Sequence, residues 1–368
     1  MRILYVTTIG ITMNFFNSFV KLLIDEGHTV DIATNEITSK VPDCYREWGC
    51  TVYQIETSRS PLDRNNLIAV RQIKKLTEEN RYDIVHCHTP VVAMCTRIAC
   101  RGVRKKGTKV FYTAHGFHFY KGAPLKNRLI YYSVEKLCSY FTDVLITINQ
   151  EDYALAKKKM KANQVVYVPG VGIDLDKFGK TTVKKEEKRR ELGIPENAKW
   201  ILNVGELIPR KNQETLIRAV AKINDLYLTI AGCGELKDFL TGLIGELGVS
   251  DRIMLIGYRT DISELCNSCD AFAFSSFHEG LPVSVMEAMA SGLPVVCSRI
   301  RGNIDLIDEN GGELFDPNSV EDCRNAILRL LNKDTQEMSE YNLKRIEEFE
   351  INNVNKIMKE LYFDFLHL

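Results

Sequence analysis

The sequence has no long hydrophobic run. None of its apolar segments approaches the roughly 20 residues that a helix needs to span a bilayer, and no low-complexity tract or short repeat is visible. No secretory leader precedes the first apolar segment, which starts at once with Arg2. These absences exclude a protein embedded in the membrane, and we expect a soluble or peripheral protein that works in the cytoplasm.

Cysteine is present, but its pattern does not indicate disulfides. The 11 cysteines are an odd number, and several lie in apolar runs, as Cys87, Cys233 and Cys297 do. This usage is typical of a reduced, cytosolic protein. Cys266 and Cys269 form a Cys-x-x-Cys with no second pair nearby, so we interpret them as structural residues.

Motifs for metals and nicotinamide cofactors are also missing. No Asp-x-Asp loop stands out, and no Gly-x-Gly-x-x-Gly follows the first strand, which argues against a nicotinamide-dependent oxidoreductase. His86 and His88 fall on one face of an expected strand, but no third ligand is apparent, and we expect polar contacts at the strand end. The sequence therefore implies neither a cofactor nor a metal.

A net charge is lacking as well, yet the two halves of the chain differ. Residues 1–175 hold 24 Lys and Arg against 16 Asp and Glu, whereas the remainder holds 24 against 32. The positive first half favours an anionic partner there, such as phosphates or an anionic lipid surface. A charge fluctuation without a role is the alternative.

Apolar strands alternate with amphipathic helices along the chain. Strands rich in Val and Ile with helices between them predict parallel sheets that are covered on both faces. The expected strands are 2–6, 29–33, 83–87, 109–113, 143–147, 165–168, 200–205, 226–231, 252–256, 270–274 and 294–297, and the expected helices of the first half are 14–26, 64–79, 91–101, 124–140 and 150–161.

The alternation breaks at 170–198, which contains glycines and a charged helical run. With 368 residues, the chain has the length of two ordinary domains. We therefore predict an α/β protein with two doubly wound domains, 1–172 and 173–340. A helical segment, 341–368, is expected to follow the second domain.

The most informative stretch is a polar loop that opens a helix and reads Ser-Ser-Phe-His-Glu-Gly-Leu-Pro-Val-Ser-Val-Met-Glu-Ala from residue 275. Gly280 lets backbone approach a ligand closely. Pro282 suits a helix start, and Ser284 can cap the first amides. Such a helix end binds anions, phosphate included. Glu279 and Glu287 could flank a nucleotide sugar, the first at the sugar hydroxyls and the second at the ribose.

Glu279-x7-Glu287 and the block around it resemble the signature of the family-4 retaining glycosyltransferases, and the resemblance extends over nearly the whole chain. It implies the GT-B fold, in which two facing Rossmann-like domains enclose a cleft. It also implies a nucleotide-sugar donor on the second domain and an acceptor on the first, with the last helical segment crossing back to the first domain. The donor-binding residues that it assigns are Gly205, Arg210, Lys211, Gly234, Tyr258, Gly280, Leu281, Pro282, Ser284 and Glu287, and the catalytic residues are His115 and Glu279.

The loop after the expected strand 200–205 carries two cations. Arg210 and Lys211 can neutralise a diphosphate leaving group, and Arg can do so with two parallel hydrogen bonds. The family usually has Gly-Arg-Leu in this loop, whereas Glu206 stands here at the position of that Arg. We therefore expect Arg210 to be its substitute.

Two further loops of the second domain are assigned to the nucleotide. Gly234, in Ala-Gly-Cys-Gly-Glu, permits close approach of backbone to the ligand. By resemblance, backbone near Tyr258 reads the edge of the base, while Tyr258 or Arg259 covers it. The habit of the family favours uracil.

The first domain supplies a histidine. His115 ends a strand, and the resemblance places it against the donor sugar, where it could bind the sugar or stabilise charge near the anomeric carbon. His118 is a weaker candidate for contact with the acceptor. The first loop has only Gly10 where the family often has two or three glycines, so this loop is expected on the acceptor side.

Aromatic residues and cations interleave over residues 117–137. Their helical spacing suits the edge of a bilayer, and cations from Arg97 to Lys109 add to the positive field. The alternative is that the aromatics belong to the core and the cations to a solvated rim. The residues concerned are Phe117, Phe119, Tyr120, Lys121, Leu125, Lys126, Arg128, Leu129, Ile130, Tyr131, Tyr132 and Lys136.

We expect a retaining, metal-independent glycosyltransferase of the hexosyltransferase type that uses a nucleotide sugar, with UDP favoured. Residues 113–122 resemble the branch that builds capsular polysaccharide or exopolysaccharide, which implies a lipid-linked saccharide acceptor at the inner face of the plasma membrane. The expected partners are thus the nucleotide sugar, that acceptor and an anionic membrane surface, without nucleic acid.

Two other functions share this layout. A nucleotide-sugar 2-epimerase has the same fold and needs no lipid acceptor, so product analysis with the donor alone would separate it. A non-catalytic sugar-nucleotide-binding subunit would be indicated if replacement of Glu279 or Lys211 by Ala left transfer undiminished.

Overall fold

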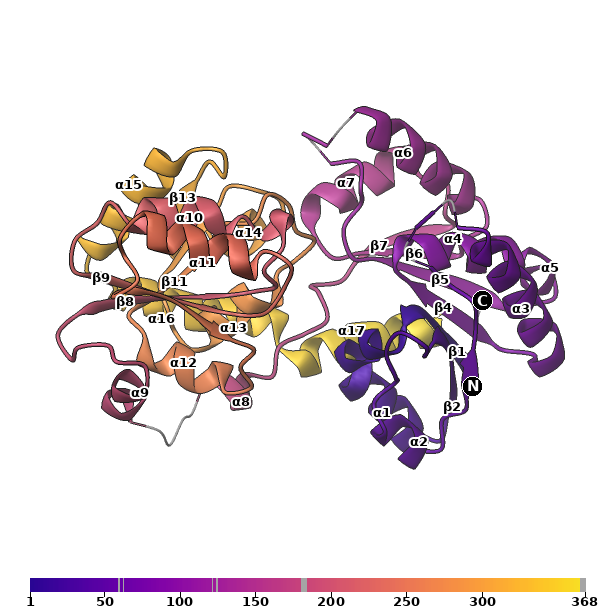
Figure 1. Ribbon diagram of the computed structural model, residues 1–368. Coiled ribbons are helices and arrows are strands. Elements are labelled where there is room, and N and C mark those ends of the chain that lie inside the picture. Colours follow the sequence, from indigo (N-terminus) through magenta and orange to yellow (C-terminus); the bar gives the residue numbers. More distant parts are fainter. Residues whose placement is uncertain (59, 62, 121, 124, 180–183, 365–368) are drawn as a thin grey trace. The chain divides into compact units, whose positions relative to one another are not determined.

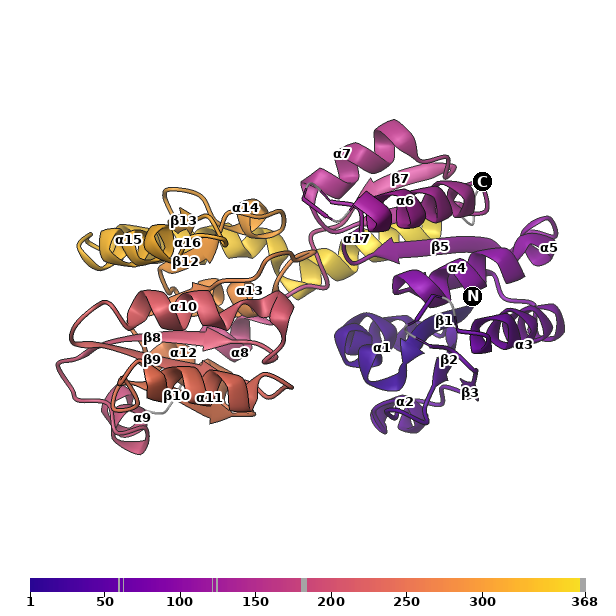
Figure 2. The ribbon, with the colours of Figure 1, turned by 45° about the horizontal axis from the view of Figure 1, so that its top comes forward.

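The computed structural model describes residues 1–364 apart from 59, 62, 121, 124 and 180–183, and it leaves the side chains of 126 and 127 undescribed. The chain forms two compact units, one of Met1–Val171 together with the chain from Asn352 onward, and one of Gly172–Ile351. Each unit is a layer of parallel strands with helices on both faces (Figure 1 and Figure 2). Within the described ranges, no helix is long and apolar enough to cross a membrane.

The first unit contains a parallel sheet that, over the described residues, has seven strands in the order β3-β2-β1-β4-β5-β6-β7. Leu4 and Val6 point to one face and Ile3 and Tyr5 to the other, as the alternation of a strand requires. The strands are β1 (Arg2–Ile9), β2 (Thr29–Asn35), β3 (Val52–Gln54), β4 (Ile84–His88), β5 (Lys109–Ala114), β6 (Val144–Thr147) and β7 (Gln164–Tyr167).

Helices cover both faces of this sheet. The core on the side of Leu4 includes Ile73 of α3 and Val92 of α4, and the core on the side of Ile3 includes Val20 of α1 and Met358 of α17. The helices are η1 (Gly10–Phe16), α1 (Asn17–Asp25), α2 (Cys44–Glu47), α3 (Asn65–Asn80), α4 (Pro90–Ala99), α5 (Arg101–Arg104), α6 (Leu125–Ser139), α7 (Gln150–Lys159) and α17 (Ile351–Asp364).

The second unit repeats the design with strands in the order β10-β9-β8-β11-β12-β13. Its strands are β8 (Lys199–Val204), β9 (Leu226–Ala231), β10 (Ile253–Gly257), β11 (Ala271–Phe274), β12 (Val295–Ser298) and β13 (Gly312–Phe315). Its helices are α8 (Leu175–Gly179), α9 (Lys185–Glu191), η2 (Pro209–Lys211), α10 (Gln213–Val220), α11 (Lys237–Glu246), α12 (Ile262–Ser268), α13 (Val283–Ala290), α14 (Asn303–Leu306), α15 (Val320–Leu331), α16 (Gln336–Ile346) and η3 (Glu347–Phe349).

The change from one unit to the other occurs where two chain segments run side by side. Ile173 N donates a hydrogen bond to Phe349 O at 2.9 Å, and Ile351 N donates to Ile173 O at 2.9 Å. Gly172 has φ +83°, and a Cβ there would lie 2.7 Å from Ile351 Cα, so glycine is required. The sequence predicts a returning segment at 341–368; in the structure α16 belongs to the second unit and the first unit resumes at Asn352.

The strand order of each sheet reverses next to its first strand. This happens between β1 and β4 in the first unit and between β8 and β11 in the second. Ligands of doubly wound sheets bind at the carboxyl ends of strands at such switch points. The loops that follow β1, β4, β8 and β11 are therefore the places to look for a site, and they hold most of the residues predicted from the sequence, whereas His115 follows the neighbouring strand β5.

Candidate functional site

In the second unit, the loops after β8 and β11 are joined by hydrogen bonds at the switch point. Phe277 N donates to Arg210 O at 2.9 Å, and Ser275 Oγ donates to Lys211 O at 3.0 Å. Asn212, held at φ +53°, donates from Nδ2 to Ser275 O at 3.1 Å. The short turn η2 and the Glu279 loop are thus fixed to each other before any ligand arrives.

Glu279 is the centre of a small ion cluster. Its Oε1 lies 2.8 Å from Lys211 Nζ and 2.7 Å from Arg210 Nη1. Burial opposes ionisation of this carboxyl, but the charges of Lys211 and Arg210 outweigh it and lower the pKa of Glu279. The cluster of two cations and one carboxylate therefore carries one net positive charge at neutral pH.

Lys211 is held more tightly than Arg210. The stem of Lys211 packs on Gly205, with Cδ 3.5 Å from where a Cβ of that glycine would be, and its ammonium lies 4.8 Å from the centre of the Phe274 ring. Burial lowers the pKa of Lys211, although Glu279 raises it. The Arg210 side chain remains one-third exposed, so a ligand can approach its guanidinium directly.

Pro282 stands at the start of the helix after the Glu279 loop, as predicted, but Ser284 does not cap that helix. Pro282 is the N-cap of α13, and Ser284 lies inside the first turn without a capping hydrogen bond from its side chain. The capping role expected for Ser284 was therefore wrong, because the helix begins one residue before it. Val285 N and Met286 N both donate to Pro282 O, at 3.2 and 3.3 Å, so only the amides before Val285 face the end of the helix.

Glu287 lies on α13 in a different setting from Glu279. It is half-buried and has no ion-pair partner in the described part of the chain. Burial raises the pKa of Glu287 to about 7, and Lys177 lowers it only in part. The two glutamates of the signature therefore differ in charge: Glu279 is ionised at neutral pH, whereas Glu287 is about half protonated.

In the first unit, three histidines gather at the carboxyl ends of β4 and β5. His88 Nδ1 lies 3.2 Å from His115 Nε2, and the rings of His86 and His88 are 4.1 Å apart. His86 is hydrogen-bonded to Thr113 Oγ1 at 2.8 Å and to the hydroxyl of Tyr362. The polar contacts predicted for the end of β4 are confirmed, and His115 takes part in them.

These imidazoles are uncharged at neutral pH. Burial lowers the pKa of His86 to about 3 and that of His115 to about 4, and it lowers the pKa of His88 as well. They line a cavity of about 40 Å³ together with Phe16 and other apolar side chains. His115 can therefore act through hydrogen bonds and its ring dipole, not as a cation. Among the described residues, no group of His, Cys, Asp and Glu is arranged to hold a metal.

Comparison with known proteins identifies the family. The family described as "Glycosyl transferases group 1" matches residues 184–345, and that described as "Glycosyl transferase 4-like" matches residues 2–149. The protein EpsD of Bacillus subtilis (strain 168) is 39% identical over 319 residues, or 84% of this chain and 82% of EpsD. The UDP-Gal:alpha-D-GlcNAc-diphosphoundecaprenol alpha-1,3-galactosyltransferase of Escherichia coli is 31% identical over 82% of this chain and 80% of that enzyme.

The chain is a family-4 glycosyltransferase. Solved structures show its fold: Anabaena HepE in complex with UDP and glucose has a TM-score of 0.80 at 20% identity, covering 99% of this chain and 100% of that one. Sucrose-phosphate synthase from Thermosynechococcus elongatus has a TM-score of 0.82 at 20% identity over the whole of both chains. The predicted GT-B fold is confirmed. As a member of the family, the enzyme is a retaining glycosyltransferase that uses nucleotide sugars.

The structure shows why three positions of this glycosyltransferase require glycine, which the sequence did not reveal. A Cβ at Gly232 would lie 1.9 Å from Gly205 O, one at Gly234 would lie 2.4 Å from Leu207 O, and one at Gly10 would lie 2.4 Å from Ser39 O. The close approach that these positions require is to the chain's own backbone. Packing between neighbouring loops therefore explains them without a ligand.

Of the remaining predicted residues of the glycosyltransferase, Leu281 is buried, whereas Tyr258 and His118 are on the surface. The Tyr258 side chain is 78% exposed, whereas Arg259 is bound by Asp261 and Glu191. Tyr258 is thus the side chain that is able to cover a base. His118 is exposed and lies with its ring centre 4.9 Å from that of Tyr131.

Arg301 was missed from the sequence, although it supports the Glu279 turn. It follows β12, is buried, and donates from Nε to Glu279 O at 3.1 Å. Gly302, at φ +79°, lies so close beneath the turn that a Cβ would be 2.4 Å from Gly280 O. An Arg-Gly pair after a buried strand was the available signal, but it is common in loops of many proteins.

Thr89 was also missed, because backbone strain leaves no mark on a sequence. It follows β4 at the first switch point with φ +67°, which is rare for a β-branched residue. Its hydroxyl lies 2.6 Å from that of Thr8, at the end of β1. Such strain is often kept at functional sites, and here it is located beside His88.

The aromatic and basic stretch divides into two parts in the structure. Phe117 and Phe119 are buried and stacked with ring centres 4.6 Å apart, whereas Leu125, Leu129 and Ile130 of α6 are exposed. Lys121 and the side chain of Lys126 lie outside the described residues. Arg97 is fully buried and paired with Glu135 at 2.8 Å, so the expectation that it adds to the surface field was wrong.

Proposed function

We propose that this enzyme transfers a sugar from a UDP-sugar to a hydroxyl group of a lipid-linked saccharide. The observation that carries the proposal is the ion cluster of Glu279, Lys211 and Arg210 at the switch point of the second sheet. One net positive charge next to the start of α13 suits a diphosphate, because fixed cations and unpaired amides stabilise anions.

The relatives favour these substrates. The Escherichia coli enzyme is named for a UDP-galactose donor and a diphosphoundecaprenol-linked acceptor. A Campylobacter jejuni relative, 36% identical over 34% of this chain, is likewise named for an acceptor on diphospho-undecaprenol. We carry both classes over to this enzyme, and with them a role in polysaccharide biosynthesis.

The proposed reaction proceeds on one face of the sugar. The bond from the anomeric carbon to the diphosphate breaks, the acceptor oxygen bonds to the same face, and the acceptor proton passes to the departing phosphate. Arg210, Lys211 and the start of α13 stabilise the growing negative charge. We assign Glu279 to orienting the sugar, Glu287 to the ribose hydroxyls and uncharged His115 to a hydrogen bond with the donor sugar.

The test is a screen of radiolabelled UDP- and GDP-sugars with lipid-linked saccharides or membranes as acceptors. We expect labelled lipid product with a UDP-sugar, and a loss of roughly 100-fold or more in kcat for Lys211→Met and Glu279→Gln, because each removes part of a preorganised charge arrangement. Glu214→Gln is the matched control, since Glu214 forms an exposed pair with Arg218 on α10.

Three outcomes would count against the proposal. Conversion of the donor alone to an epimer would indicate an epimerase. Undiminished transfer by both variants would move the active site elsewhere. Transfer from GDP-sugars only would show that the donor nucleotide is GDP and not UDP. Unfolding curves of the variants separate lost chemistry from lost structure, because breaking a buried ion pair also destabilises a protein.

We further propose that the first unit contacts an anionic membrane surface through the end of its sheet at which β5, β6 and β7 begin. Three loops meet there: Arg104 Nη1 donates to Tyr140 O at 2.9 Å, Lys161 N donates to Ser139 Oγ at 2.8 Å, and Asn163 N donates to Thr142 O at 3.2 Å. We call the exposed cations of these loops and of the helices α5 and α7 that lead into them the basic edge; they are Arg101, Lys105, Lys106, Lys157, Lys158, Lys159 and Lys161.

Two acids beside the basic edge are already paired. Asp143 lies 2.9 Å from Arg104, and Glu78, which faces Gly102, lies 3.9 Å from Lys74. A hollow of about 660 Å³ lies between Arg101, Lys105 and the rings of Tyr140 and Phe141. Exposed cations next to aromatic rings suit lipid headgroups, and such a contact would bring the enzyme to a lipid-linked acceptor.

A further inference from the structure

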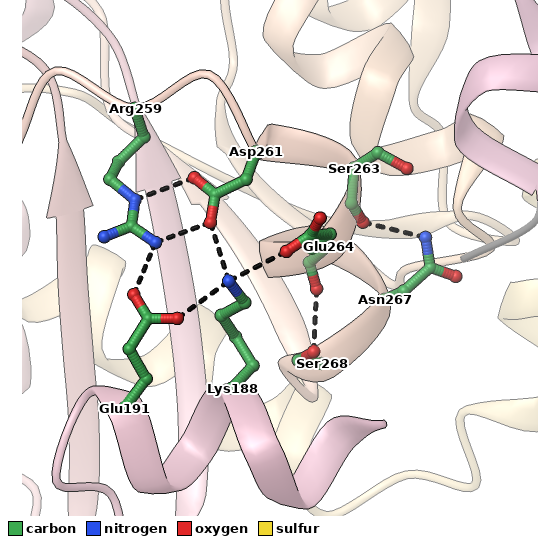
Figure 3. A network of polar contacts seen from close by, with 8 residues as sticks. All are labelled: Lys188, Glu191, Arg259, Asp261, Ser263, Glu264, Asn267 and Ser268. Atoms are coloured by element: carbon green, nitrogen blue, oxygen red, sulfur yellow. Dashed lines mark hydrogen bonds and ion pairs between the residues drawn. The ribbon is translucent and has the colours of Figure 1, made fainter. Parts of the chain in front are cut away.

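Five charged side chains of the second unit form a closed network that no step of the proposed reaction uses (Figure 3). Lys188 and Glu191 come from α9, Arg259 and Asp261 from the loop after β10, and Glu264 from the first turn of α12. The network thus joins two segments, 188–191 and 259–264, that are far apart in the sequence.

The contacts use all three N–H groups of Lys188 and two of the three nitrogens of Arg259. Lys188 Nζ lies 2.8 Å from Glu191, 2.7 Å from Asp261 and 2.8 Å from Glu264, so each of its three N–H groups has a carboxylate. Arg259 donates from Nε to Asp261 Oδ1 at 2.7 Å and from Nη2 to Glu191 Oε1 at 2.6 Å. Glu191 and Asp261 each bind both cations and close the ring.

The network is partly removed from water and stays charged. The Lys188 side chain is only 7% exposed. The hydrogen bond from Arg259, joined by one from Lys188 and opposed by burial, holds the pKa of Asp261 well below its usual range. Ion pairs that are partly buried and linked in this way are more rigid than isolated surface pairs.

The segment that the network holds is the one after β10. Gly257 O accepts a hydrogen bond from Gly232 N at 2.8 Å, which fixes the end of the strand. Beyond it, Tyr258 and Thr260 are exposed, and in the described part of the chain the backbone N–H groups of Tyr258 and Arg259 make no hydrogen bond. Two backbone N–H groups are therefore available to a ligand here, while the side chains of Arg259 and Asp261 are held in ion pairs.

We infer that Lys188 and Arg259 are positioning residues: through Asp261 and Glu191 they fix the backbone of residues 257–260 so that it can read the edge of the nucleobase. The inference rests on the proposed nucleotide-sugar donor. Arg259 itself does not cover the base, because its guanidinium is occupied by two carboxylates. An ordered loop loses less conformational entropy when a ligand binds, which raises affinity without a new contact.

The experiment compares two probes, UDP and inorganic diphosphate, by calorimetric titration of the whole protein. Arg259→Gln removes the ion pairs with Asp261 and Glu191. We expect it to weaken UDP binding about tenfold, which corresponds to about 1.4 kcal/mol. Binding of inorganic diphosphate should not change, because that probe has no base. In turnover, the KM for the donor should rise by a similar factor at constant kcat.

A second variant and a control keep the result interpretable. Arg259→Lys retains the charge but cannot bridge two carboxylates in the fork geometry of Arg, so an intermediate loss of UDP affinity is expected even if Arg259→Gln is poorly folded. Glu313→Gln is the matched control: Glu313 binds Arg329 at 2.8 Å and Lys333 at 2.7 Å in the same unit, and its loss should leave UDP binding unchanged.

The outcomes are distinguishable. UDP affinity that is equal in wild type and both Arg259 variants overturns the inference. A parallel loss of UDP and diphosphate binding overturns it too, since the network would then be supporting the unit as a whole. If wild type binds diphosphate as tightly as it binds UDP, the uridine adds no affinity and the base is not read at this segment. If wild type binds neither probe, the proposed function itself fails.

Discussion

Glu287 is a carboxyl group whose ionisation falls near neutral pH. Burial raises its pKa from about 4.5 in the unfolded chain to about 7 in the folded protein. The folded state therefore binds this proton more tightly than the unfolded chain does. As a result, Glu287 lowers the free energy of unfolding as the pH rises from about 4.5 through 7. Such a cost is typical of groups that are kept for function.

The variant Glu287→Gln should accordingly separate stability from binding. We expect a higher melting temperature than wild type at pH 8, and a difference that disappears near pH 4, because the wild-type carboxyl is then neutral as well. UDP should bind more weakly to the variant and without the rise in affinity through pH 7 that a carboxylate at the ribose would give. Thermal unfolding and UDP titration across this pH range measure both effects.

Glu313→Gln is a control variant for which we expect the opposite change in melting temperature. Burial opposes ionisation of Glu313, but the hydrogen bonds from Lys333 and Arg329 win and lower its pKa. Its carboxylate therefore adds stability above its unfolded pKa, and the variant should melt lower at pH 8. If Glu287→Gln melts lower as well, the raised pKa of Glu287 is contradicted.

At the scale of elements, α4 and α6 are joined by a buried ion pair. Arg97 is fully buried, lies 2.8 Å from Glu135 Oε2 and has its guanidinium carbon 4.1 Å from the centre of the Tyr112 ring. A charge left alone in such a place is costly because water cannot solvate it. The pair thus fixes the register of α6 on the sheet and turns Leu125 and Leu129 outward.

Arg97→Ala should lower the free energy of unfolding by roughly 3–5 kcal/mol, because Glu135 is left buried without its partner. The double variant Arg97→Met with Glu135→Leu should recover most of that loss, since apolar side chains of similar size avoid the desolvation cost. Denaturant titration of both variants measures the difference. A double variant as unstable as Arg97→Ala would show that packing around Arg97, not its charge, is what matters.

At the scale of the whole molecule, the zero net charge hides a segregation of charge along the chain. Residues 1–175 have the excess of Lys and Arg, and part of it is exposed at the basic edge. A surface of one sign attracts anionic membranes at low salt and loses this attraction as salt screens it.

Vesicle pelleting tests the membrane contact. We expect binding to anionic phosphatidylglycerol vesicles at low salt, little binding to neutral vesicles, and a loss of about 100-fold when Lys157, Lys158 and Lys159 are changed to Gln, at roughly 1 kcal/mol per lysine. The control replaces three exposed lysines of the second unit, Lys222, Lys237 and Lys344. Equal binding by the two triple variants would leave the basic edge without a role.

The expected strands were recovered from alternation of apolar runs, while two short ones escaped. β3 has three residues and β13 has four, and both lie at the edge of their sheets. Neither is a continuous apolar run, since β3 reads Val-Tyr-Gln and β13 reads Gly-Glu-Leu-Phe. The capping role of Ser284 is wrong for another reason: whether Pro282 or Ser284 caps α13 depends on where the loop leaves the sheet.

The sequence alone determined the two parallel sheets, the family and the residues around Glu279, since buried parallel strands must be continuously apolar and a twenty-residue signature is hard to match by chance. Tertiary structure alone decided the charge states of the site and the contacts that support it. Glu279 is ionised between two cations, Glu287 is half protonated, and the three histidines are neutral. Arg259 is paired with Glu191 of a distant segment. The physical reason is that burial and neighbouring charge set ionisation and hydrogen bonding, and neighbours in space are not neighbours in sequence.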